Sequence, residues 1–431
     1  MTVFRRYALG DTGQVNWLEI QPLLEPDFVF LDSLTESHVR LGTESASKVA
    51  MVKLNGGLGT TMGCKGPKSA IPIHHGQTFL DIIADQIKDL QQKYGASFPL
   101  ILMNSESTAK ETEALLKGKI SYNDLLQHEF PRIDTLTQAP VSFSDDPQQE
   151  WSPAGHGDFY YSLVLSGTLD RLMAQGIEYV FISNADNLGP TFDPAILGYI
   201  METQRDFLME TTPKTKMDVK GGTLIRRQGC LELLERAQVP HEHLSEFEDM
   251  SMFPVFNTNN IWVRLASLKT LFEKEPLHLS LIVNTKIIEG RSIVQLETAL
   301  GSAISLFEKS ATIVVGRDRF LPVKKTSDLL VIKSDLVQKG ALDTLCFGDR
   351  DTLLAQVPEV NLSTHFESIQ NFNARVTQVP SLKHLRSLTL DGDITLGKNV
   401  VFKGDVVVKV VPGKTLLLEN RVLENQSLLI E

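Results

Sequence analysis

The middle of the chain alternates short apolar runs with longer segments of helical periodicity, and this alternation limits the possible folds more than any other feature. The runs at 49–54, 98–103 and 179–183 are predicted to be buried strands, because each is short and rich in apolar and β-branched residues. Segment 78–94 has apolar residues at helical spacing and is followed by Gly95, a typical helix stop. Strands that alternate with helices form a mostly parallel, helix-covered sheet, whose ligands bind beyond the carboxyl ends of the strands.

The end of the chain follows a different pattern. From about residue 384 it consists of short β-like runs broken by Gly and Asp. Apolar residues recur there every six positions, at Leu388, Ile394, Val400 and Val406. This period, with intervening glycines, is typical of a hexapeptide β-helix, although an ordinary meander of short strands is the alternative. About four repeats would leave apolar surface at the end of the coil, so we expect a partner subunit or the main domain to cover it.

Charge and composition restrict the partners. The formal net charge is −11, which gives no general attraction for nucleic acid polymers or anionic membranes, so any phosphate site has to be local. The three cysteines are far apart and show neither a disulfide framework nor a zinc-binding spacing, which fits a reducing compartment. No segment approaches the roughly 18 apolar residues that span a bilayer. We expect a cytoplasmic protein that binds neither membrane nor nucleic acid.

The most informative segment is 53–69, KLNGGLGTTMGCKGPKS, which follows the first predicted strand. Glycines leave room for backbone N–H groups to surround phosphate oxygens, and Lys65 and Lys68 bring positive charge to the same loop. The segment has neither the ending of a Walker loop nor the spacing of a dinucleotide-binding loop. A purely structural turn is the alternative. The glycines concerned are Gly56, Gly57, Gly59 and Gly63.

This segment closely resembles the nucleotide-binding loop of the eukaryotic-type UDP-glucose pyrophosphorylases. The resemblance extends over nearly the whole chain, and collinear motifs of this kind are far more specific than any one of them. The further matches are Gln127 in LLQHEFPRI, Gly155 and His156 in PAGHGDFY, SNADNLG from Ser183, KMDVKGGTL from Lys216, FNTNN from Phe256, IVQLETA from Ile293 and FLPVKKTSDL from Phe320. The sequence of the first loop, LNGGLGTTMG, points to the glucose branch of this group.

The resemblance implies a fold and an activity. The fold is a Rossmann-like nucleotidyltransferase domain with a mixed, mostly parallel α/β sheet, followed by a small C-terminal left-handed β-helix. We accordingly expect a helical extension over 1–45, the catalytic domain over 46–330, and a C-terminal domain over 331–431 that contains the coil. The activity is that of a UTP:glucose-1-phosphate uridylyltransferase with Mg²⁺ as cofactor.

Residues of the nucleotide half follow from the same resemblance. Gln127 is implied to hold the uracil together with the first loop, and its amide has both the donor and the acceptor that a uracil edge requires. Alone, such a residue is more often a surface glutamine. The other residues implied to hold the uracil and ribose are Leu54, Asn55, Gly56, Gly57 and Gly155.

The phosphate groups are implied to meet one carboxylate and two lysines. Asp186 follows the strand at 179–183 and corresponds to the family's Mg²⁺ ligand; one carboxylate suffices, because Mg²⁺ also takes water and phosphate oxygens. An Asx-turn or helix cap before Pro190 is the structural alternative. Lys68 and Lys324 correspond to the lysines that offset phosphate charge; the family motif favours Lys324 over its neighbour Lys325, for which a solvent-exposed charge is the alternative.

The sugar phosphate is implied to lie opposite the nucleotide, among side chains that offer paired donors and acceptors. Each of these residues has an ordinary alternative, such as a strand-end turn or a solvated position. His156 is the exception, since its flanking glycines leave it no apolar face to pack against. The implied residues are His156, Asn184, Lys220, Asn259 and Glu297.

The implied reaction is a direct, in-line attack of glucose 1-phosphate on the α-phosphorus of UTP. It needs placement and charge cancellation but no covalent intermediate and no general base. Two alternatives remain: a uridylyltransferase for galactose or N-acetylhexosamine 1-phosphate, and a catalytically silent scaffold that binds UDP-sugars. A homo-oligomer formed through the C-terminal coil is a further expectation.

Overall fold

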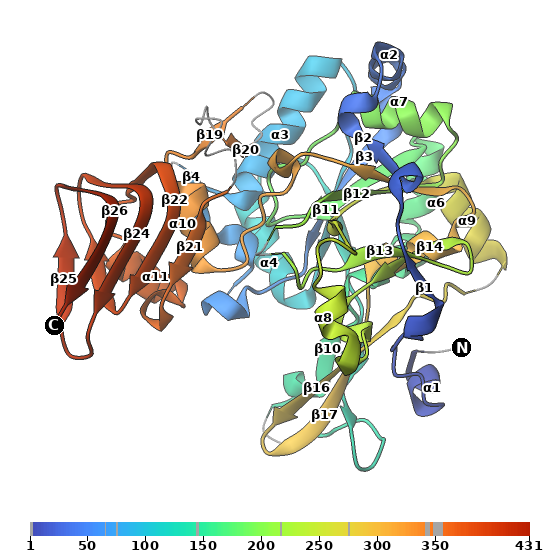
Figure 1. The fold of residues 1–431 in the computed structure, drawn as a ribbon. Helices are drawn as coiled ribbons and strands as arrows, with labels where there is room; N and C mark the ends of the chain where they lie inside the picture. The colour runs from blue at the N-terminus through green and yellow to red at the C-terminus, as the bar shows by residue number, and fades with distance from the viewer. Residues whose placement is uncertain are drawn as a thin grey trace.

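A computed structural model describes residues 3–64, 66–74, 76–143, 146–215, 218–274, 276–340, 345–347 and 357–431. An eight-stranded sheet lies at its centre, with helices around it and a stack of strands at one side that ends at the C-terminus (Figure 1). Its strand order is β2 (Phe28–Phe30), β18 (Ser310–Val314), β12 (Phe207–Pro213), β15 (Val255–Arg264), β11 (Tyr179–Asn184), β3 (Val49–Asn55), β6 (Leu100–Asn104) and β7 (Asn123–Leu126). All neighbours in this sheet pair in parallel except β15, which is antiparallel to β11 and β12. The predicted mixed, mostly parallel sheet is confirmed.

The predicted strands and helix also form. Strands β3, β6 and β11 match the three apolar runs within two residues, and helix α3 spans Phe79–Tyr94. The Thr78 side chain accepts a hydrogen bond from the Asp81 N–H at the start of α3. The helix ends at Gly95, whose φ of 59° is a left-handed conformation that favours glycine.

Helices cover both faces of the central sheet, because alternate residues of each strand point to opposite sides. Val49 of β3 packs in a core with α3 and with α7 (Pro194–Glu202). Its neighbour Ala50 packs in a second core with α5 (Phe159–Leu165), α6 (Thr168–Ala174) and α9 (Leu265–Lys274). The sheet is therefore a buried middle layer, and only its edges and strand ends are open to ligands.

The reversed strand β15 brings polar residues to the carboxyl ends of the parallel strands, where sheets of this kind bind ligands. Ile182 of β11 pairs with Ile261 of β15, and Tyr179 pairs with Arg264. The carboxyl end of β11 therefore lies beside the amino-terminal half of β15, which carries the sequence FNTNN. Residues from a reversed strand thus reach the same edge as the loops after β3 and β11.

The first 45 residues are more than the expected helical extension. They contain the helices α1 (Val3–Ala8) and α2 (Glu36–Glu44), and α2 packs on α7. They also supply β2, the edge strand of the central sheet, and β1 (Ile20–Pro22), which pairs with β13 (Thr223–Arg227). Both strands are only three residues long, so neither shows a clear period in the sequence.

The C-terminal segment forms two parallel stacks. One contains β21 (Glu359–Leu362), β22 (Ser381–Asp391), β24 (Val400–Val410) and β26 (Arg421–Ile430), and the other pairs β23 (Asp393–Leu396) with β25 (Thr415–Leu418). A meander would pair consecutive strands antiparallel, so that alternative is excluded. The four apolar residues at six-residue spacing are all buried, and Leu388 pairs with Val406.

The C-terminal stacks pack on the main domain rather than standing apart from it. Leu388 and Val406 belong to the same apolar cluster as Phe79 of α3. Gly63, in the glycine-rich segment, comes so close to Ser368 that an added Cβ would lie 3.1 Å from the Ser368 Cβ. The Ser368 hydroxyl in turn accepts a hydrogen bond from Asn371 N–H and caps α11 (Ile369–Arg375). The glycine-rich segment therefore rests on the start of α11.

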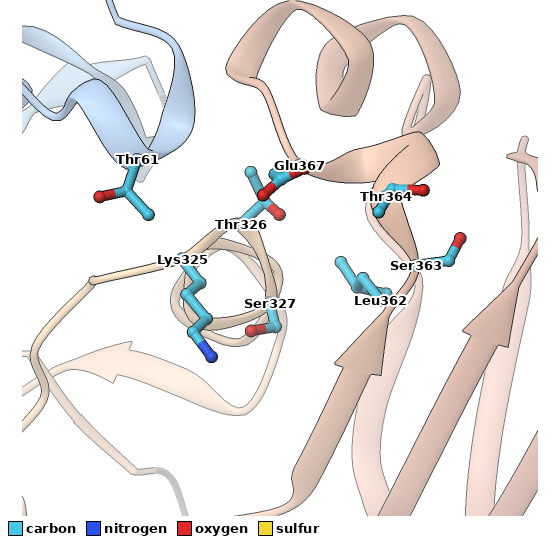
Figure 2. Close-up of a pocket in the computed structure, with 8 residues that line it drawn as sticks. All are labelled: Thr61, Lys325, Thr326, Ser327, Leu362, Ser363, Thr364 and Glu367. Atoms are coloured by element: carbon cyan, nitrogen blue, oxygen red, sulfur yellow. The ribbon is translucent and has the colours of Figure 1, made fainter. Parts of the chain in front are cut away.

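A cavity lies beside this contact (Figure 2). It is bounded by the glycine-rich segment, by the start of α10 (Thr326–Lys333) and by the segment after β21. Its lining includes Thr61, Lys325, Thr326, Ser363, Thr364 and Glu367. None of the sequence-predicted site residues lines it, so this cavity is not the predicted site.

The remaining described elements border this framework. They are β4 (Pro72–His74), β5 (Gln77–Thr78), α4 (Glu106–Leu116), β8 (Glu129–Pro131), β9 (Ile133–Asp134), β10 (Trp151–Pro153), β14 (Cys230–Leu234), α8 (Leu244–Phe247), β16 (Leu281–Ile288), β17 (Arg291–Thr298), β19 (Val337–Lys339), β20 (Leu345–Phe347) and short 3₁₀ turns. The longest helix, α3, has 16 residues. Among the described residues, no helix is both long and apolar enough to cross a membrane.

Candidate active site

The glycine-rich segment leaves β3 and folds back on itself. Gly59 and Gly63 have φ values of 60° and 63° on either side of a 3₁₀ turn, which explains glycine at these two positions. The Lys68 N–H donates a hydrogen bond to the Gly57 carbonyl at 3.1 Å, so the end of the segment returns to its beginning. This fold places Lys68 at the carboxyl end of β3. Lys65 lies outside the described residues.

Lys68 reaches the loop after β11 and contacts Asp186 there. Its Nζ lies 2.6 Å from Oδ2 of Asp186, and both side chains are largely buried, with 14% and 21% of their surface exposed. The other carboxylate oxygen, Oδ1 of Asp186, is buried and has no hydrogen-bond partner among the described residues. A predicted catalytic lysine and the predicted metal-binding carboxylate therefore meet, with one carboxylate oxygen left free for a further positive group.

Lys324 approaches the same place from a third segment. The Val323 N–H donates to the Asp186 carbonyl at 3.1 Å, which ties the residue before Lys324 to the Asp186 loop. The Lys324 N–H donates to Oδ2 of Asp328 at 2.7 Å, and the Lys324 side chain is exposed. Burial raises the pKa of Asp328, although the N–H groups it binds and the charge of Lys68 pull it down. Asp328 was not identified from the sequence, where it resembles an ordinary capping residue.

His156 lies close enough to Lys324 to respond to its charge. Burial lowers the pKa of His156 to about 4, and the positive charge of Lys324 contributes to the shift. The ring Nδ1 accepts a hydrogen bond from Leu300 N–H at 2.7 Å, so the neutral ring carries its proton on Nε2. His156 is therefore a neutral hydrogen-bond donor above acidic pH and is no general acid there.

The nucleotide half is brought together around one glutamine. The Gln127 Nε2 donates to the Gly155 carbonyl at 2.8 Å, and a Cβ added at Gly56 would lie 2.7 Å from Gln127 Oε1. Gly56 therefore has to be a glycine for Gln127 to occupy this position. Leu54 accepts a hydrogen bond from Ala185 N–H at 3.0 Å, which joins the end of β3 to the Asp186 loop.

Asn55 differs from its neighbours in this half. Its Nδ2 donates to Asn104 Oδ1 and Thr112 Oγ1 at 2.7 and 2.9 Å. Its Oδ1 accepts from Ser69 Oγ at 2.5 Å, and the residue is only 4% exposed. Because both ends of the side chain are engaged inside the protein, a nucleotide contact from Asn55 falls to its backbone.

Two of the sugar-half residues touch each other at the edge formed by β11 and β15. The Asn259 Nδ2 donates to Asn184 Oδ1 at 2.9 Å, while Asn259 Oδ1 is buried without a partner among the described residues. Asn259 has a φ of 61°, a left-handed conformation that Asn tolerates better than most residues. The asparagine pair thus presents an unused acceptor beside the Asp186 loop.

The remaining sugar-half residues are only partly brought together. Glu297 lies next to Gly155, where an added Cβ would be 3.1 Å from the Glu297 Cβ, and its carboxylate accepts from Asn284 at 3.3 Å. Lys220 is exposed in a turn before β13, and no hydrogen bond or ion pair joins it to another described residue. Lys216, earlier in the same motif, lies outside the described residues.

Glu235 is a carboxylate that none of the sequence motifs identified. A Cβ added at Gly222 would lie 2.6 Å from its Oε2, so the glycine makes room for the carboxylate. Burial raises the pKa of Glu235, and the charge of Lys324 lowers it. Glu235 therefore lies within electrostatic reach of Lys324, as His156 does. The glycine pair before β13 was the only available signal.

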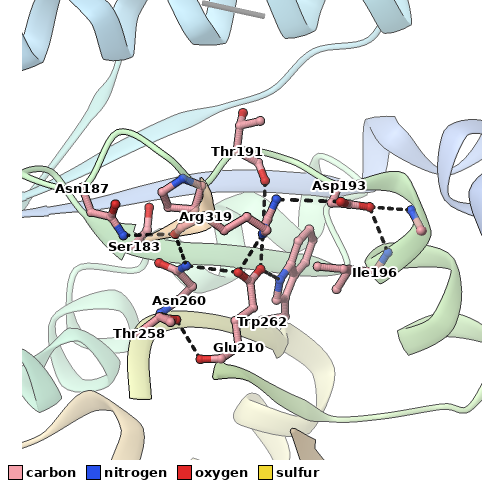
Figure 3. Close-up of polar contacts among 12 residues, drawn as sticks. Ser183, Asn187, Thr191, Asp193, Ile196, Glu210, Thr258, Asn260, Trp262 and Arg319 are labelled. Carbon is pink, nitrogen blue, oxygen red and sulfur yellow. Dashed lines mark hydrogen bonds and ion pairs between the residues drawn. The ribbon is translucent and has the colours of Figure 1, made fainter. Parts of the chain in front are cut away.

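Beneath these residues lies a buried polar network that was also missed (Figure 3). Arg319 donates from Nε and Nη2 to both oxygens of Glu210, at 2.9 and 2.6 Å, and Glu210 is fully buried. The Glu210 carboxylate also accepts from Trp262 Nε1 and Asn260 Nδ2. Lys53 of β3 is buried beside this pair and donates to Ser183 Oγ at 2.8 Å. Burial lowers the pKa of Lys53 to about 7, and the charge of Arg319 adds to the effect.

The comparisons with known proteins agree on one family. A family model described as UTP--glucose-1-phosphate uridylyltransferase matches residues 1–403. A UTP--glucose-1-phosphate uridylyltransferase from Hordeum vulgare is 42% identical over 436 residues, which cover 99% of this chain and 92% of that protein. An enzyme of the same name from Saccharomyces cerevisiae is also 42% identical, over 98% of this chain and 86% of its own.

Solved structures show the same similarity. A UDP-glucose phosphorylase from Trypanosoma brucei superimposes with a TM-score of 0.89 at 36% identity, over 100% of this chain and 95% of the other. A mutant UDP-glucose pyrophosphorylase from Leishmania major, in complex with UDP-glucose, gives a TM-score of 0.90 at 33% identity, over 99% and 94% of the two chains. The similarity therefore includes the C-terminal stacks as well as the central sheet.

Proposed function

The chain belongs to the UTP--glucose-1-phosphate uridylyltransferase family, and we propose that its active site makes UDP-glucose and pyrophosphate from UTP and glucose 1-phosphate. The observation that carries this proposal is the pairing of Lys68 with Asp186 at the ends of β3 and β11. A reaction between two polyanions needs positive charge and a fixed geometry at the point of attack. The Lys324 segment, bound to the Asp186 backbone, adds a second lysine at the same place.

Each half of the site holds one substrate. The uracil and ribose bind against the end of β3, Gln127 and Gly155. The glucose 1-phosphate binds on the other side, where His156 donates from Nε2 and the Asn184–Asn259 pair offers donors and acceptors. Lys220, Glu297 and the buried carboxylate of Glu235 complete the sugar half.

A phosphate oxygen of glucose 1-phosphate attacks the α-phosphorus of UTP in line with the bond to the bridging oxygen. A new P–O bond forms as that bond breaks, and pyrophosphate departs with the bonding electron pair. Lys68 and Lys324 offset the charge of the phosphates without a covalent intermediate. Since the attacking oxygen is already a nucleophile, no proton has to be removed, and the low pKa of His156 makes its ring a weak base.

Mg²⁺ is the proposed cofactor, and the donor set fits it. Among the described residues, no three His, Cys, Asp or Glu side chains gather to hold a metal. A single carboxylate is nevertheless enough for Mg²⁺ when nucleotide phosphates supply the other oxygens, and Asp186 Oδ1 is a buried carboxylate oxygen without a partner in the described structure. When bound, Mg²⁺ would neutralise phosphate charge.

The C-terminal stacks are proposed to be a left-handed β-helix that supports a homo-oligomer in the cytoplasm. Strand β26 is the last in its stack, and its Val422 and Leu429 are 59% and 56% exposed. An open strand edge with exposed apolar residues is suited to pairing with a second copy. Val422→Lys should then lower the mass measured by light scattering, whereas an unchanged mass would exclude this edge as the contact.

The activity is tested by measuring pyrophosphate release from UTP in the presence of Mg²⁺. We expect release to require glucose 1-phosphate and to be much slower with galactose or N-acetylglucosamine 1-phosphate. Asp186→Asn serves as the matched negative control. If release is equally fast with another sugar phosphate, glucose 1-phosphate is not the specific substrate. If no sugar phosphate supports release, the proposed function is overturned.

A further inference from the structure

Two loops far apart in the sequence are joined at several points below the active site. One is the Asp186 loop, 185–190, and the other is the segment 317–323 that leads to Lys324. Besides the bond from Val323 N–H to the Asp186 carbonyl, Asn187 and Pro322 form an isolated antiparallel bridge. A Cβ on Gly189 would collide with the Asp318 carbonyl, so the two backbones are in close contact. The first of these segments carries Asp186, and the second leads directly to Lys324.

Asn187 makes the side-chain connection between them. It is fully buried, and its Oδ1 accepts from Leu321 N–H at 2.8 Å. Its Nδ2 donates to the Arg319 carbonyl at 3.4 Å. One side chain therefore binds the backbone of the opposite segment at two positions, two residues apart. Only a group with a donor and an acceptor at the same end can do this.

The segment that Asn187 grips is itself fixed from below (Figure 3). The Arg319 side chain is held by Glu210 and also donates to the Thr191 carbonyl at 3.1 Å. Asn260 donates to the Arg319 carbonyl at 3.1 Å and so supports the same carbonyl that Asn187 binds. Arg319 and Glu210 are buried and satisfy each other's hydrogen-bonding groups. The segment around Arg319 therefore has little freedom to move.

We propose that Asn187 is a positioning residue for the uridylyl transfer, which fixes the segment leading to Lys324 against the Asp186 loop. The proposal rests on the proposed function, because it assumes that Lys324 acts on the phosphates. Asn187 is adjacent to Asp186 in sequence, and its contact at Leu321 lies three residues before Lys324. Loss of the two Asn187 side-chain bonds therefore loosens the attachment of the segment leading to Lys324, which the backbone contacts hold only in part, while the groups proposed to bind uracil and ribose stay in place.

The decisive experiment is a double-mutant cycle between Asn187→Ala and Lys324→Ala. We expect Asn187→Ala to lower kcat by roughly tenfold or more, because small misplacements of a charged group are costly, and to leave the KM for UTP within about threefold. In the Lys324→Ala background, the same change should lower kcat by less than about twofold, because the group it positions is absent. A merely structural role would not produce this loss of effect.

Thr312→Val is the matched control. It removes another buried hydrogen bond from a side chain to a backbone carbonyl, from Thr312 Oγ1 to Met209 at 3.0 Å in the central sheet, together with the contact to Thr211 Oγ1 at 3.1 Å. We expect it to lower the thermal midpoint without changing kcat. If it lowers kcat as much as Asn187→Ala, the effect is general destabilisation and the proposal is overturned. Should Asn187→Ala fail to fold, Asn187→Ser is measured in the same cycle.

The cycle also separates this proposal from the one on which it rests. Equal losses of kcat from Asn187→Ala with and without Lys324 would overturn the positioning role and leave the role of Lys324 intact. An unchanged kcat in Lys324→Ala alone would instead overturn the role of Lys324 in the transfer. A folded Asn187→Ala protein with undiminished kcat would directly refute the positioning role of Asn187.

Discussion

Lys68 Nζ and Asp186 Oδ2 lie 2.6 Å apart although 118 positions separate the two residues in the chain. The contact follows from topology, because β3 and β11 are parallel neighbours and their carboxyl ends meet at one edge. In the proposed site, a cation bound at Asp186 would share this carboxylate with the ammonium group of Lys68. The pair therefore gives two separate predictions, one for each partner.

Lys68→Met should lower kcat by roughly 10²-fold or more, since it removes a charge that stabilises the transition state while keeping much of the side-chain volume. Folding should survive, because the side chain is near the edge of the core. Steady-state kinetics and the thermal midpoint would be measured together. Lys119→Met, which breaks the ion pair with Asp81 away from the strand ends, is the control and should keep its kcat. A Lys68→Met protein with more than about half of the original kcat would remove Lys68 from the mechanism.

Asp186→Asn keeps the shape of the side chain but removes its charge. Activity should collapse, and excess Mg²⁺ should restore it only in part, because the carboxylate that binds the metal is gone. The measurement is a titration of initial rate with Mg²⁺. Asp170→Asn, at the exposed pair with Lys269, is the control. An Asp186→Asn titration identical to that of the original protein would show that Asp186 serves only as a turn residue.

His156 makes the folded state sensitive to acid. Its pKa is about 4 in the folded protein and about 6.5 in an unfolded chain. Between these values the unfolded chain binds a proton that the folded protein does not, so stability falls as the pH falls through this window. The free energy of unfolding by urea, measured from pH 7 to pH 4, should decrease less steeply for His156→Gln. Exposed His241, changed to Gln, should leave the slope unaltered, and equal slopes for all three proteins would contradict the prediction.

Lys53 makes the stability of the folded protein depend on pH above neutrality. Burial and the charge of Arg319 hold its pKa at about 7, compared with about 10.4 in an unfolded chain. Between these values the unfolded chain binds the extra proton, so Lys53 makes the protein more stable as the pH rises from 7. Urea unfolding between pH 6.5 and 9 should show this rise in the original protein and lose most of it in Lys53→Met. Lys48→Met, which changes a lysine in a partly exposed pair with Glu178, should retain it.

The framework of the fold was predictable because its signals are local. The apolar runs at β3, β6 and β11 and the capped helix α3 each show their character within a few residues. Strands β1 and β2 could not be predicted in this way, because three residues are too few to show a hydrophobic period. The reversal of β15 was also invisible, since strand direction depends on pairing with distant neighbours.

Some residues of the candidate site were likewise predictable from the sequence, and others were not. The motifs predicted roles for Lys68, Asp186 and Gln127, and the fold brings these residues to the strand ends. They did not reveal the contacts of Glu210 or Arg319, because a buried ion pair looks in sequence like two surface charges and only its partner distinguishes it. The contacts of Asn187 could not be predicted either. The motif SNADNLG marked the loop, but it did not show that the second asparagine binds the backbone of another segment.

Gly63 and Ser368 have a consequence for how sequences of this kind change over time. Gly63 has a positive φ and almost touches Ser368, and Ser368 is held in place as the cap of α11. A side chain at position 63 would press on Ser368, so we expect the two positions to change together. Across an alignment of relatives, small residues at these positions should be kept together, and a larger residue at 368 should coincide with an altered glycine-rich segment. The C-terminal segment would then constrain the sequence of the glycine-rich segment, which is proposed to hold the nucleotide, although it supplies none of the groups proposed to touch it.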